Sequence, residues 1–200
     1  MFIDWCKGGF PVLPTPSLAY PHLNLKLSPV LTTYPSEKGI TFESLFNRYW
    51  AIDFQDALAD FIVRHNYPEV STTVSQRRAD NTLLPFRRVS VFHKVKFNDP
   101  VVGDATTIDA VHIRPEAHDL CGHTILGWFD TAFVRYGSRF QVVQICLVFQ
   151  LPRSARSSIF LSLRPAPPED LAYVELFSPL SMPDENHGMY CISRSYCNGR

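Results

Sequence analysis

Three side chains of the kind that bind zinc lie close together in the sequence. They are His118, Cys121 and His123, with the spacing H-x2-C-x-H. Imidazole and thiolate ligands at this spacing could share one zinc ion. A closed structural site needs four ligands, and Cys191 and Cys197 could contribute only if the fold brings them near. We therefore expect an ordinary exposed loop with no metal and no cofactor, and keep a zinc-binding module as an alternative.

A dense run of basic residues between positions 77 and 96 is the second group that could do chemistry. Its members are Arg77, Arg78, Arg87, Arg88, Lys94 and Lys96. Asp80 is the one acidic residue among them, so the local charge is six minus one, or +5, in a chain of net charge zero. Phe86 and Phe92 lie between the cations, which suits contact with phosphates and some base stacking. The alternative is a solvated helix face followed by the polar side of an edge strand.

Sequence signatures of enzymes are missing. The chain has no G-x-S-x-G, no catalytic-cysteine signature, no phosphate-binding loop and no G-x-G-x-x-G. His93 alternates with valines of core type, which favours a hydrogen-bonded histidine in a sheet over a general base. We expect the chain not to be an enzyme and to have no small-molecule substrate.

The composition is that of a globular protein. Of 200 residues, 46% are apolar and 19% are charged, which is enough for one substantial domain. The sequence pI of about 7.0 excludes a whole-chain field that would attract nucleic acid or membrane. No signal-peptide pattern and no apolar run of about 20 residues is present. We therefore expect an intracellular protein that does not associate with membranes, whose five cysteines are free thiols.

The elements that must position these residues follow from periodicity. Helices are predicted over residues 43–49, 54–65 and 72–81, with Asp53 and either Ser71 or Thr72 as N-caps of the last two. Strands are predicted over 89–97, 106–113, 127–136, 140–151, 159–163, 171–177 and 189–194. The run 140–151 is almost entirely apolar, so it is predicted to be a strand covered on both faces that pairs with 127–136 as a hairpin. Its core residues would be Val143, Ile145, Leu147 and Phe149.

The order of these elements defines an α+β protein. Short N-terminal helices precede a mostly antiparallel small β-barrel or curled sheet. We predict a proline-rich irregular leader over residues 1–38, which contains six prolines. A helical subdomain is expected over 39–82 and a β domain over 83–200. The apolar stripe of the helix at 54–65 is expected to dock on the sheet, because an isolated helix of this length is marginal in water.

Several segments resemble the C-terminal region of transposase-like proteins of mushroom-forming fungi, of the Kyakuja–Dileera–Zisupton kind that includes Plavaka. The segments are YPHLNLKLSP from Tyr20, DALADFIVRHNYP, LLPFRRVSVFHKVKF, GWFDTAFVRYG, FQVVQICLVFQLP, LAYVELFSPL and HGMYCISRS. Their order and spacing cover most of residues 20–199.

The resemblance implies an accessory domain rather than an active site. Transposases of this kind are expected to cut and join DNA with a metal-dependent carboxylate core that lies upstream, and no part of that core matches here. The family tail usually runs further, so Asn198, Gly199 and Arg200 are predicted to be an early end of the β domain. The resemblance therefore implies a nuclear or formerly nuclear context and a non-catalytic domain that binds DNA or a protein partner. A truncated fragment without retained activity is the alternative.

Overall fold

The computed structural model describes residues 2–3, 28–98, 109–136, 139–162, 165, 167–178 and 191–194. Its helices are α1 (Phe42–Tyr49), α2 (Phe54–Asn66), α3 (Thr72–Asp80) and α4 (Arg153–Ile159). Its strands are β1 (Phe2–Ile3), β2 (Ser28–Leu31), β3 (Glu37–Thr41), β4 (Arg88–Phe92), β5 (Lys94–Asn98), β6 (Asp109–Arg114), β7 (Ala117–His118), β8 (Thr124–Ile125), β9 (Trp128–Phe129), β10 (Thr131–Tyr136), β11 (Arg139–Gln150) and β12 (Asp170–Leu176). The predicted α+β class and the mostly antiparallel pairing are confirmed.

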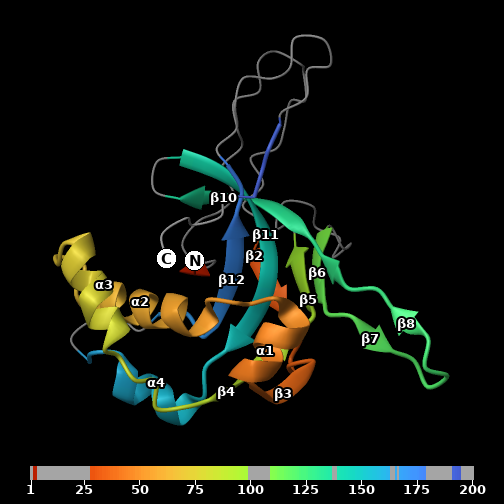
Figure 1. Ribbon diagram of the computed structural model, residues 1–200, viewed down its shortest axis with the longest axis horizontal. Coiled ribbons are helices and arrows are strands. Elements are labelled where there is room, and N and C mark those ends of the chain that lie inside the picture. Colours follow the sequence, from red (N-terminus) through yellow and green to blue (C-terminus); the bar gives the residue numbers. More distant parts are fainter. Residues whose placement is uncertain are drawn as a thin grey trace.

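Strand β11 is the centre of the largest sheet, whose order is β1-β12-β11-β4-β3. One edge of β11 pairs with β12, and the other edge pairs with β10 near its start and with β4 near its end. Figure 1 shows β11 and β12 side by side in the middle of the molecule. The predicted hairpin is confirmed for residues 131–136, which form β10. The strand predicted over 127–136 is nevertheless broken at Asp130, and its first part, β9, pairs with β6 in another sheet.

Both faces of β11 are covered by other parts of the chain. The four predicted core residues, Val143, Ile145, Leu147 and Phe149, are all 0% exposed. They do not share one face: Val143 and Ile145 pack with Val148 in one hydrophobic cluster, whereas Leu147 and Phe149 belong to the other, and the pairing register with β12 shifts between Ile145 and Leu147. An apolar run that is buried on both faces needs no polar alternation, which explains why the sequence of this strand is almost continuously hydrophobic.

Helix α2 docks on the sheet through one apolar face, as predicted. Its residues Phe54, Leu58 and Ile62 are buried, and the ring centroid of Phe54 lies 5.0 Å from that of Phe149 on β11. Leu45 of α1 belongs to the same hydrophobic cluster. Helices α1 and α2 of the predicted 39–82 subdomain therefore share one core with the sheet, whereas α3 packs on α2 through a separate small cluster.

The N-caps differ in detail from the expectation. Asp53 and Ser71 hold the N-cap positions of α2 and α3, but neither side chain makes a capping hydrogen bond. In α1, the Thr41 hydroxyl accepts a hydrogen bond from the backbone N–H of Ser44 at 3.2 Å. Trp50 ends α1 in the left-handed region with φ 56°, and so turns the chain toward α2.

The strand predicted over 89–97 is broken at His93, so that prediction was wrong in one respect. Before the break β4 pairs with β3 and β11, and after it β5 pairs with β2 and β6 in a second sheet of order β2-β5-β6-β9. The carbonyl of His93 accepts a hydrogen bond from the N–H of Ile113 at 2.9 Å. Strict alternation assigned Phe92 to the polar face, but Val91 and Phe92 are both buried because each packs in a different hydrophobic cluster.

A second bend, at Asp130 between β9 and β10, joins the same two sheets. Its backbone N–H donates to the carbonyl of His112, and its carbonyl accepts from the N–H of Ile145, both at 3.0 Å. The predicted small barrel or curled sheet is nevertheless not found. The described strands form sheets of six, four and two strands that do not close and are not strongly curled. The six-stranded sheet ends at β1 on one side and at β3 on the other.

The weak strand predicted over 159–163 is not found in its described part, residues 159–162, where Ile159 ends helix α4 and a turn follows. Pro152 holds the N-cap position of α4, and Ala155 is buried against the body. The side-chain amide of Asn66 on α2 donates to the carbonyl of Ile159 at 2.8 Å and accepts from the N–H of Leu161 at 3.0 Å. Asn66 thus occupies backbone groups that a strand ladder would need.

The two ends of the chain fall largely outside the described residues. The predicted leader over 1–38 includes β2 and the start of β3, so its described part is not wholly irregular. Of the strand predicted over 189–194, the described residues show one isolated bridge between Phe177 and Arg194. Residues 195–200, which include the predicted early end, are not described. Among the described helices, none is both long and apolar enough to cross a membrane.

Candidate functional site

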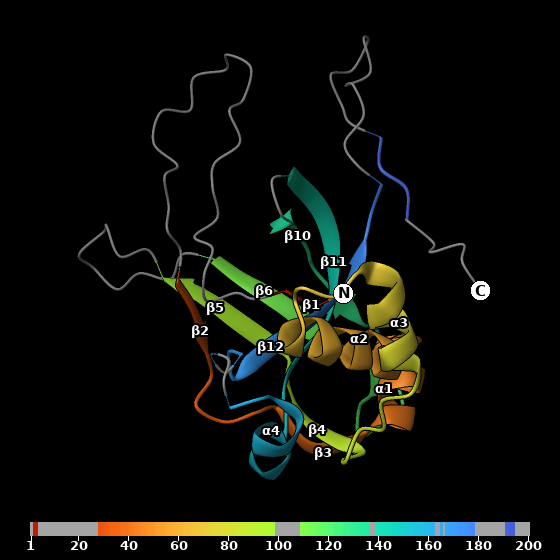
Figure 2. The same cartoon turned by 90° about the vertical axis from the view of Figure 1, so that its left-hand side faces the viewer.

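The six predicted basic residues do not form one surface. Arg77 and Arg78 are exposed on α3, Arg87 and Arg88 are exposed at the start of β4, and Lys94 and Lys96 lie on β5. Figures 1 and 2 show α3 and β5 well apart in both views. The break at His93 carries the two lysines into the second sheet, so closeness in sequence does not become closeness in space.

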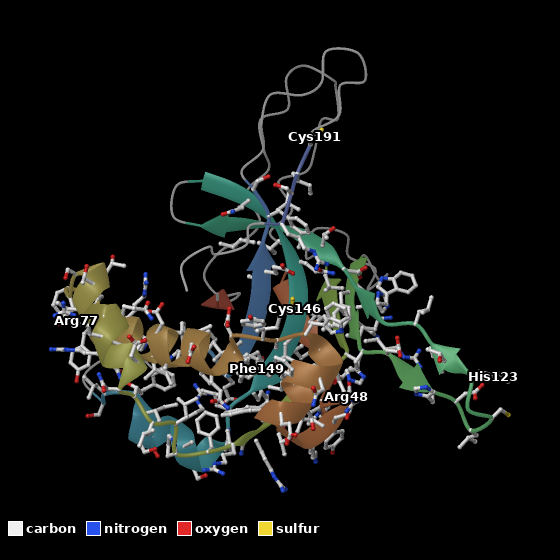
Figure 3. The ribbon with its side chains drawn as sticks, viewed as in Figure 1. Arg48, Arg77, His123, Cys146, Phe149 and Cys191 are labelled. Atoms are coloured by element: carbon white, nitrogen blue, oxygen red, sulfur yellow. The ribbon has the colours of Figure 1, made fainter. Side chains whose placement is uncertain are left out.

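Arg77 and Arg78 line a shallow surface hollow between α2 and α3. We call it the arginine hollow; its lining residues are Val63, Tyr67, Val74, Arg77, Arg78, Asn81 and Thr82. The guanidinium of Arg78 lies over the Tyr67 ring, 4.6 Å from its centroid. Figure 3 shows Arg77 at the outer end of the molecule, away from the sheets. None of the ion pairs among the described residues includes Arg77 or Arg78.

The end of α3 leaves these two guanidinium groups available. The Asn81 side chain donates to the carbonyl of Arg77, and the Thr82 hydroxyl donates to the carbonyl of Arg78, each at 2.7 Å. Cationic side chains near a helix C-terminus often bond the last carbonyls themselves. Here neighbouring side chains bond two of those carbonyls, and the hollow offers two cations beside an aromatic ring, an arrangement suited to phosphate contact.

A second cluster of polar side chains lies between α1 and the His93 break. We call it the Glu37 network: Glu37, Arg48, Tyr49 and His93. The Arg48 guanidinium binds the Glu37 carboxylate through two hydrogen bonds of 2.7 and 2.8 Å. The Tyr49 hydroxyl lies 3.2 Å from the same carboxylate and 2.8 Å from Nε2 of His93. The predicted hydrogen bonding of His93 is confirmed, although His93 lies at the break between β4 and β5 and not within a strand.

The electrostatics of the Glu37 network follow from burial and the ion pair. The hydrogen bond from Arg48 lowers the pKa of Glu37 below its ordinary value, against the effect of burial. Burial lowers the pKa of His93 despite the nearby Glu37 carboxylate. Burial also raises the pKa of Tyr49 well above its usual range. Each group is held in one protonation state near neutral pH, which suits a structural network.

A cavity of about 240 Å³ lies beside this network. Its lining residues are Arg48, Tyr49, Trp50, Glu116, Gly127, Phe129, Gln144, Cys146, Glu175 and Arg194. Burial raises the pKa of the Cys146 thiol to about 11, so it stays protonated and is a poor nucleophile at neutral pH. Arg194 donates to Oε1 of Gln144 at 3.0 Å and lies 3.9 Å from the Glu175 carboxylate. These contacts leave no activated nucleophile with an adjacent base among the lining residues.

The predicted metal loop lies at the tip of the hairpin of β7 and β8, residues 117–125, which we call the β7–β8 arm. The structure gathers ligand atoms of Asp119, Cys121 and His123 within 4.8 Å of one another. His118 is not a member of this cluster, because it lies on β7 opposite Thr124. Asp119 is the residue that the sequence analysis missed. The spacing D-x-C-x-H, with potential ligands at every second position, is the signal that could have found it.

Hydrogen bonds to Asp119 shape the tip of the arm. Its Oδ1 accepts from the backbone N–H groups of Cys121 and His123, each at 2.8 Å, and its Oδ2 lies 3.0 Å from Nδ1 of His123. The hydrogen bonds from the backbone and side chain of His123 lower the pKa of the Asp119 carboxyl. Gly122 turns the chain with φ 83°, a left-handed conformation that other residues rarely adopt.

The described residues thus define an α+β domain with two main sheets, a cation-lined hollow and a projecting arm. A family model described as a domain of unknown function (DUF6830) matches residues 7–180, so the chain belongs to that family. Searches among curated proteins and among solved structures gave no match.

Proposed function

We propose that this chain is a non-catalytic accessory domain of transposase origin that binds duplex DNA through the arginine hollow. The observation that carries the proposal is the pair Arg77 and Arg78 on one exposed helix, with no ion pair to either among the described residues. Guanidinium groups of this kind match phosphate oxygens in geometry and charge. The resemblance to fungal transposase-like proteins supports the origin and a nuclear context.

The hollow also provides groups that suit a nucleic-acid backbone. The Arg78 guanidinium packs on the Tyr67 ring, which restricts the Arg78 side chain before DNA binds. Less conformational freedom is then lost on binding. The Arg78-Tyr67 contact therefore favours binding by reducing its entropic cost.

A non-catalytic role is supported by the state of the titratable groups elsewhere. In the Glu37 network, Glu37, Arg48 and His93 already bind one another. The Cys146 thiol in the adjacent cavity is protonated at neutral pH. General acid–base chemistry needs a group whose pKa lies near the working pH and which can reach a substrate proton.

We expect the other predicted basic residues to contribute less to DNA affinity than Arg77 and Arg78. Arg87 and Arg88 follow α3 in the chain and form a second pair of exposed guanidinium groups. Lys94 and Lys96 lie on β5, which belongs to another sheet and is far from α3 in Figures 1 and 2. We propose that contributions to DNA affinity decrease in this order, from α3 to β4 to β5.

The test is duplex DNA binding across a salt series, with one charge-reversed variant for each pair. The variants are Arg77→Glu/Arg78→Glu, Arg87→Glu/Arg88→Glu and Lys94→Glu/Lys96→Glu. Because each phosphate contact contributes about −0.9 to the log–log salt slope, the first variant should flatten the slope most and the third least. Sequence preference should be weak, since contacts to phosphates carry little base information.

Arg153→Glu is the matched control for Arg77→Glu. Arg153 is exposed on α4, so its reversal changes the net charge by the same amount at another surface. We expect Arg77→Glu to weaken binding and Arg153→Glu to leave it almost unchanged. Equal loss in both would mean that only total charge matters, and the arginine hollow would be rejected. If the unmodified protein does not bind DNA at low salt, the domain is better explained as a fragment without retained activity.

A further inference from the structure

We infer that the tip of the β7–β8 arm is a binding site for a divalent transition metal of the zinc class, held by Asp119, Cys121 and His123. The inference concerns a part of the molecule that the proposed DNA contact does not use. It rests on three side chains of different chemistry whose ligand atoms gather at one point of an exposed hairpin. Figure 3 shows His123 at the far end of this arm, opposite α3 across the molecule.

The ligand set selects the class of metal. A thiolate, an imidazole and a carboxylate together suit zinc or cobalt, whereas magnesium and calcium prefer oxygen ligands alone. Cysteine is the most selective member of the set, because thiolate binds zinc-type ions strongly and magnesium hardly at all.

The distances are close to those of a coordinated ion. Metal–ligand distances of about 2.0–2.3 Å in tetrahedral geometry place ligand atoms about 3.3–3.8 Å apart. In the arm, Oδ2 of Asp119 and Nδ1 of His123 lie 3.0 Å apart across a hydrogen bond, and all three ligand atoms lie within 4.8 Å. The first pair must open slightly and the thiol must approach, and both changes need only rotation of exposed side chains.

The backbone of the tip already holds the ligands in this arrangement. Oδ1 of Asp119 is bonded to the N–H groups of Cys121 and His123, which leaves Oδ2 for the ion. The carbonyl of Asp119 accepts from the N–H of Gly122, and the N–H of Asp119 donates to the carbonyl of His123, each at 3.0 Å. A closed turn of this kind lowers the entropic cost of bringing the three ligands together.

Binding exchanges protons for the ion. The metal takes the place of the proton on Nδ1 of His123, so that the neutral imidazole carries its proton on Nε2, and the Cys121 thiol releases its proton to solvent to become a thiolate. Three protein ligands leave the fourth tetrahedral position open to water or to a side chain of another molecule. The exposure of the whole tip makes that position accessible from solvent.

The test is titration of the full-length, tag-free protein with Co²⁺, followed by absorption spectroscopy under non-thiol reducing conditions. We expect visible cobalt bands and a near-ultraviolet thiolate-to-cobalt band that saturate together and disappear when Zn²⁺ is added. Mg²⁺ should produce no displacement. Cys121→Ser should abolish the thiolate band. Asp119→Asn and His123→Gln should weaken binding by about tenfold or more, since loss of even an outer-sphere partner commonly costs about 10–100-fold.

Two matched variants test the identity of the ligands. His118→Gln replaces a nearby histidine outside the cluster, and Cys191→Ser replaces an exposed cysteine outside the arm. Both should retain the spectrum and the affinity of the parent. The inference is overturned by absence of saturable binding, by a thiolate band that survives Cys121→Ser, or by equal loss in His118→Gln and His123→Gln. Thermal unfolding of each variant checks that the fold is intact.

Discussion

In the body of the molecule, β11 contributes four side chains with no solvent exposure, whereas in the β7–β8 arm every residue from 118 to 124 is exposed. The body is held by apolar contacts between α1, α2 and the central sheet. The tip of the arm is held by hydrogen bonds to the Asp119 carboxylate and by two backbone hydrogen bonds that join Asp119 to Gly122 and His123. Figure 1 shows the arm extending away from this body.

This difference in burial means that the body provides the stability of the fold, whereas the exposed arm is available for binding. A side chain in the core contributes to folding through burial, so its type is constrained by volume and shape. A side chain at the arm tip contributes little to folding, so its type can be selected for binding. The arginine hollow is intermediate: a small buried cluster of Ala59, Val63 and Ala79 holds α2 and α3 together beneath exposed arginines.

The largest expected effect is in the body, from Leu147→Ala. Leu147 is fully buried on β11, so truncation should lower the free energy of unfolding by about 2–5 kcal/mol through lost burial and a residual cavity. Urea denaturation measures the change. Leu126→Ala is the matched control, because Leu126 is 78% exposed. A loss below about 0.5 kcal/mol for Leu147→Ala would remove the distinction between body and arm.

The next effect is expected from Asn66→Ala, which breaks the polar link between α2 and the segment after α4. Asn66 is 8% exposed, and its loss leaves the carbonyl of Ile159 and the N–H of Leu161 without their partner. We expect a destabilisation of about 1–3 kcal/mol in the same denaturation experiment. Asn81→Ala, which removes one exposed hydrogen bond, should cost less. Equal costs would show that burial does not govern the strength of these contacts.

The third prediction is a loss of stability in acid that depends on the Glu37 network. Because the pKa of His93 is below 6.5, the unfolded chain binds more protons than the folded chain between the two pKa values. The free energy of unfolding should therefore fall as the pH drops below about 6.5. The lowered pKa of Glu37 adds a further loss below its ordinary value of 4.5. Arg48, Tyr49 and Arg114 are the other charged or titratable groups that act on this site.

Measurement of the free energy of unfolding from pH 7.5 to pH 4 tests this prediction. His93→Gln keeps a side chain that can bond the Tyr49 hydroxyl but does not titrate, so it should remove the first part of the decline and leave the second. His118→Gln on the arm is the control and should not change the profile. An unchanged profile in His93→Gln would assign the acid sensitivity to other groups.

The smallest effect is expected from Leu120→Ser at the arm tip. Leu120 is 108% exposed, so replacing it removes no buried surface. The free energy of unfolding should stay within about 0.5 kcal/mol of the parent value in urea denaturation. A larger loss of unfolding free energy would mean that Leu120 packs on another surface in solution. The arm would then contribute to stability through buried contacts, as the body does.

The sequence by itself determined the body of this protein. The continuous apolar run of β11 requires burial on two faces and the apolar stripe of α2 requires burial on one face. Periodicity therefore predicted both elements and several of the residues that they bury. The hairpin of β10 and β11 followed because its strands are close in sequence. These hydrophobic patterns can be read from neighbouring residues because they depend only on which side chains are buried away from solvent.

Only the tertiary structure decided where the candidate sites lie. The break at His93 sends Lys94 and Lys96 to a different sheet from Arg88, although the sequence places them within one basic run. Ile159 ends helix α4 instead of starting a strand, and its carbonyl is bound by Asn66, 93 residues away in the chain. At the arm tip, the turn at Gly122 brings Asp119, rather than His118, to Cys121 and His123. Each outcome depends on hydrogen bonds between particular atoms, and residue type and spacing along the chain indicate candidate residues but do not determine which atoms meet.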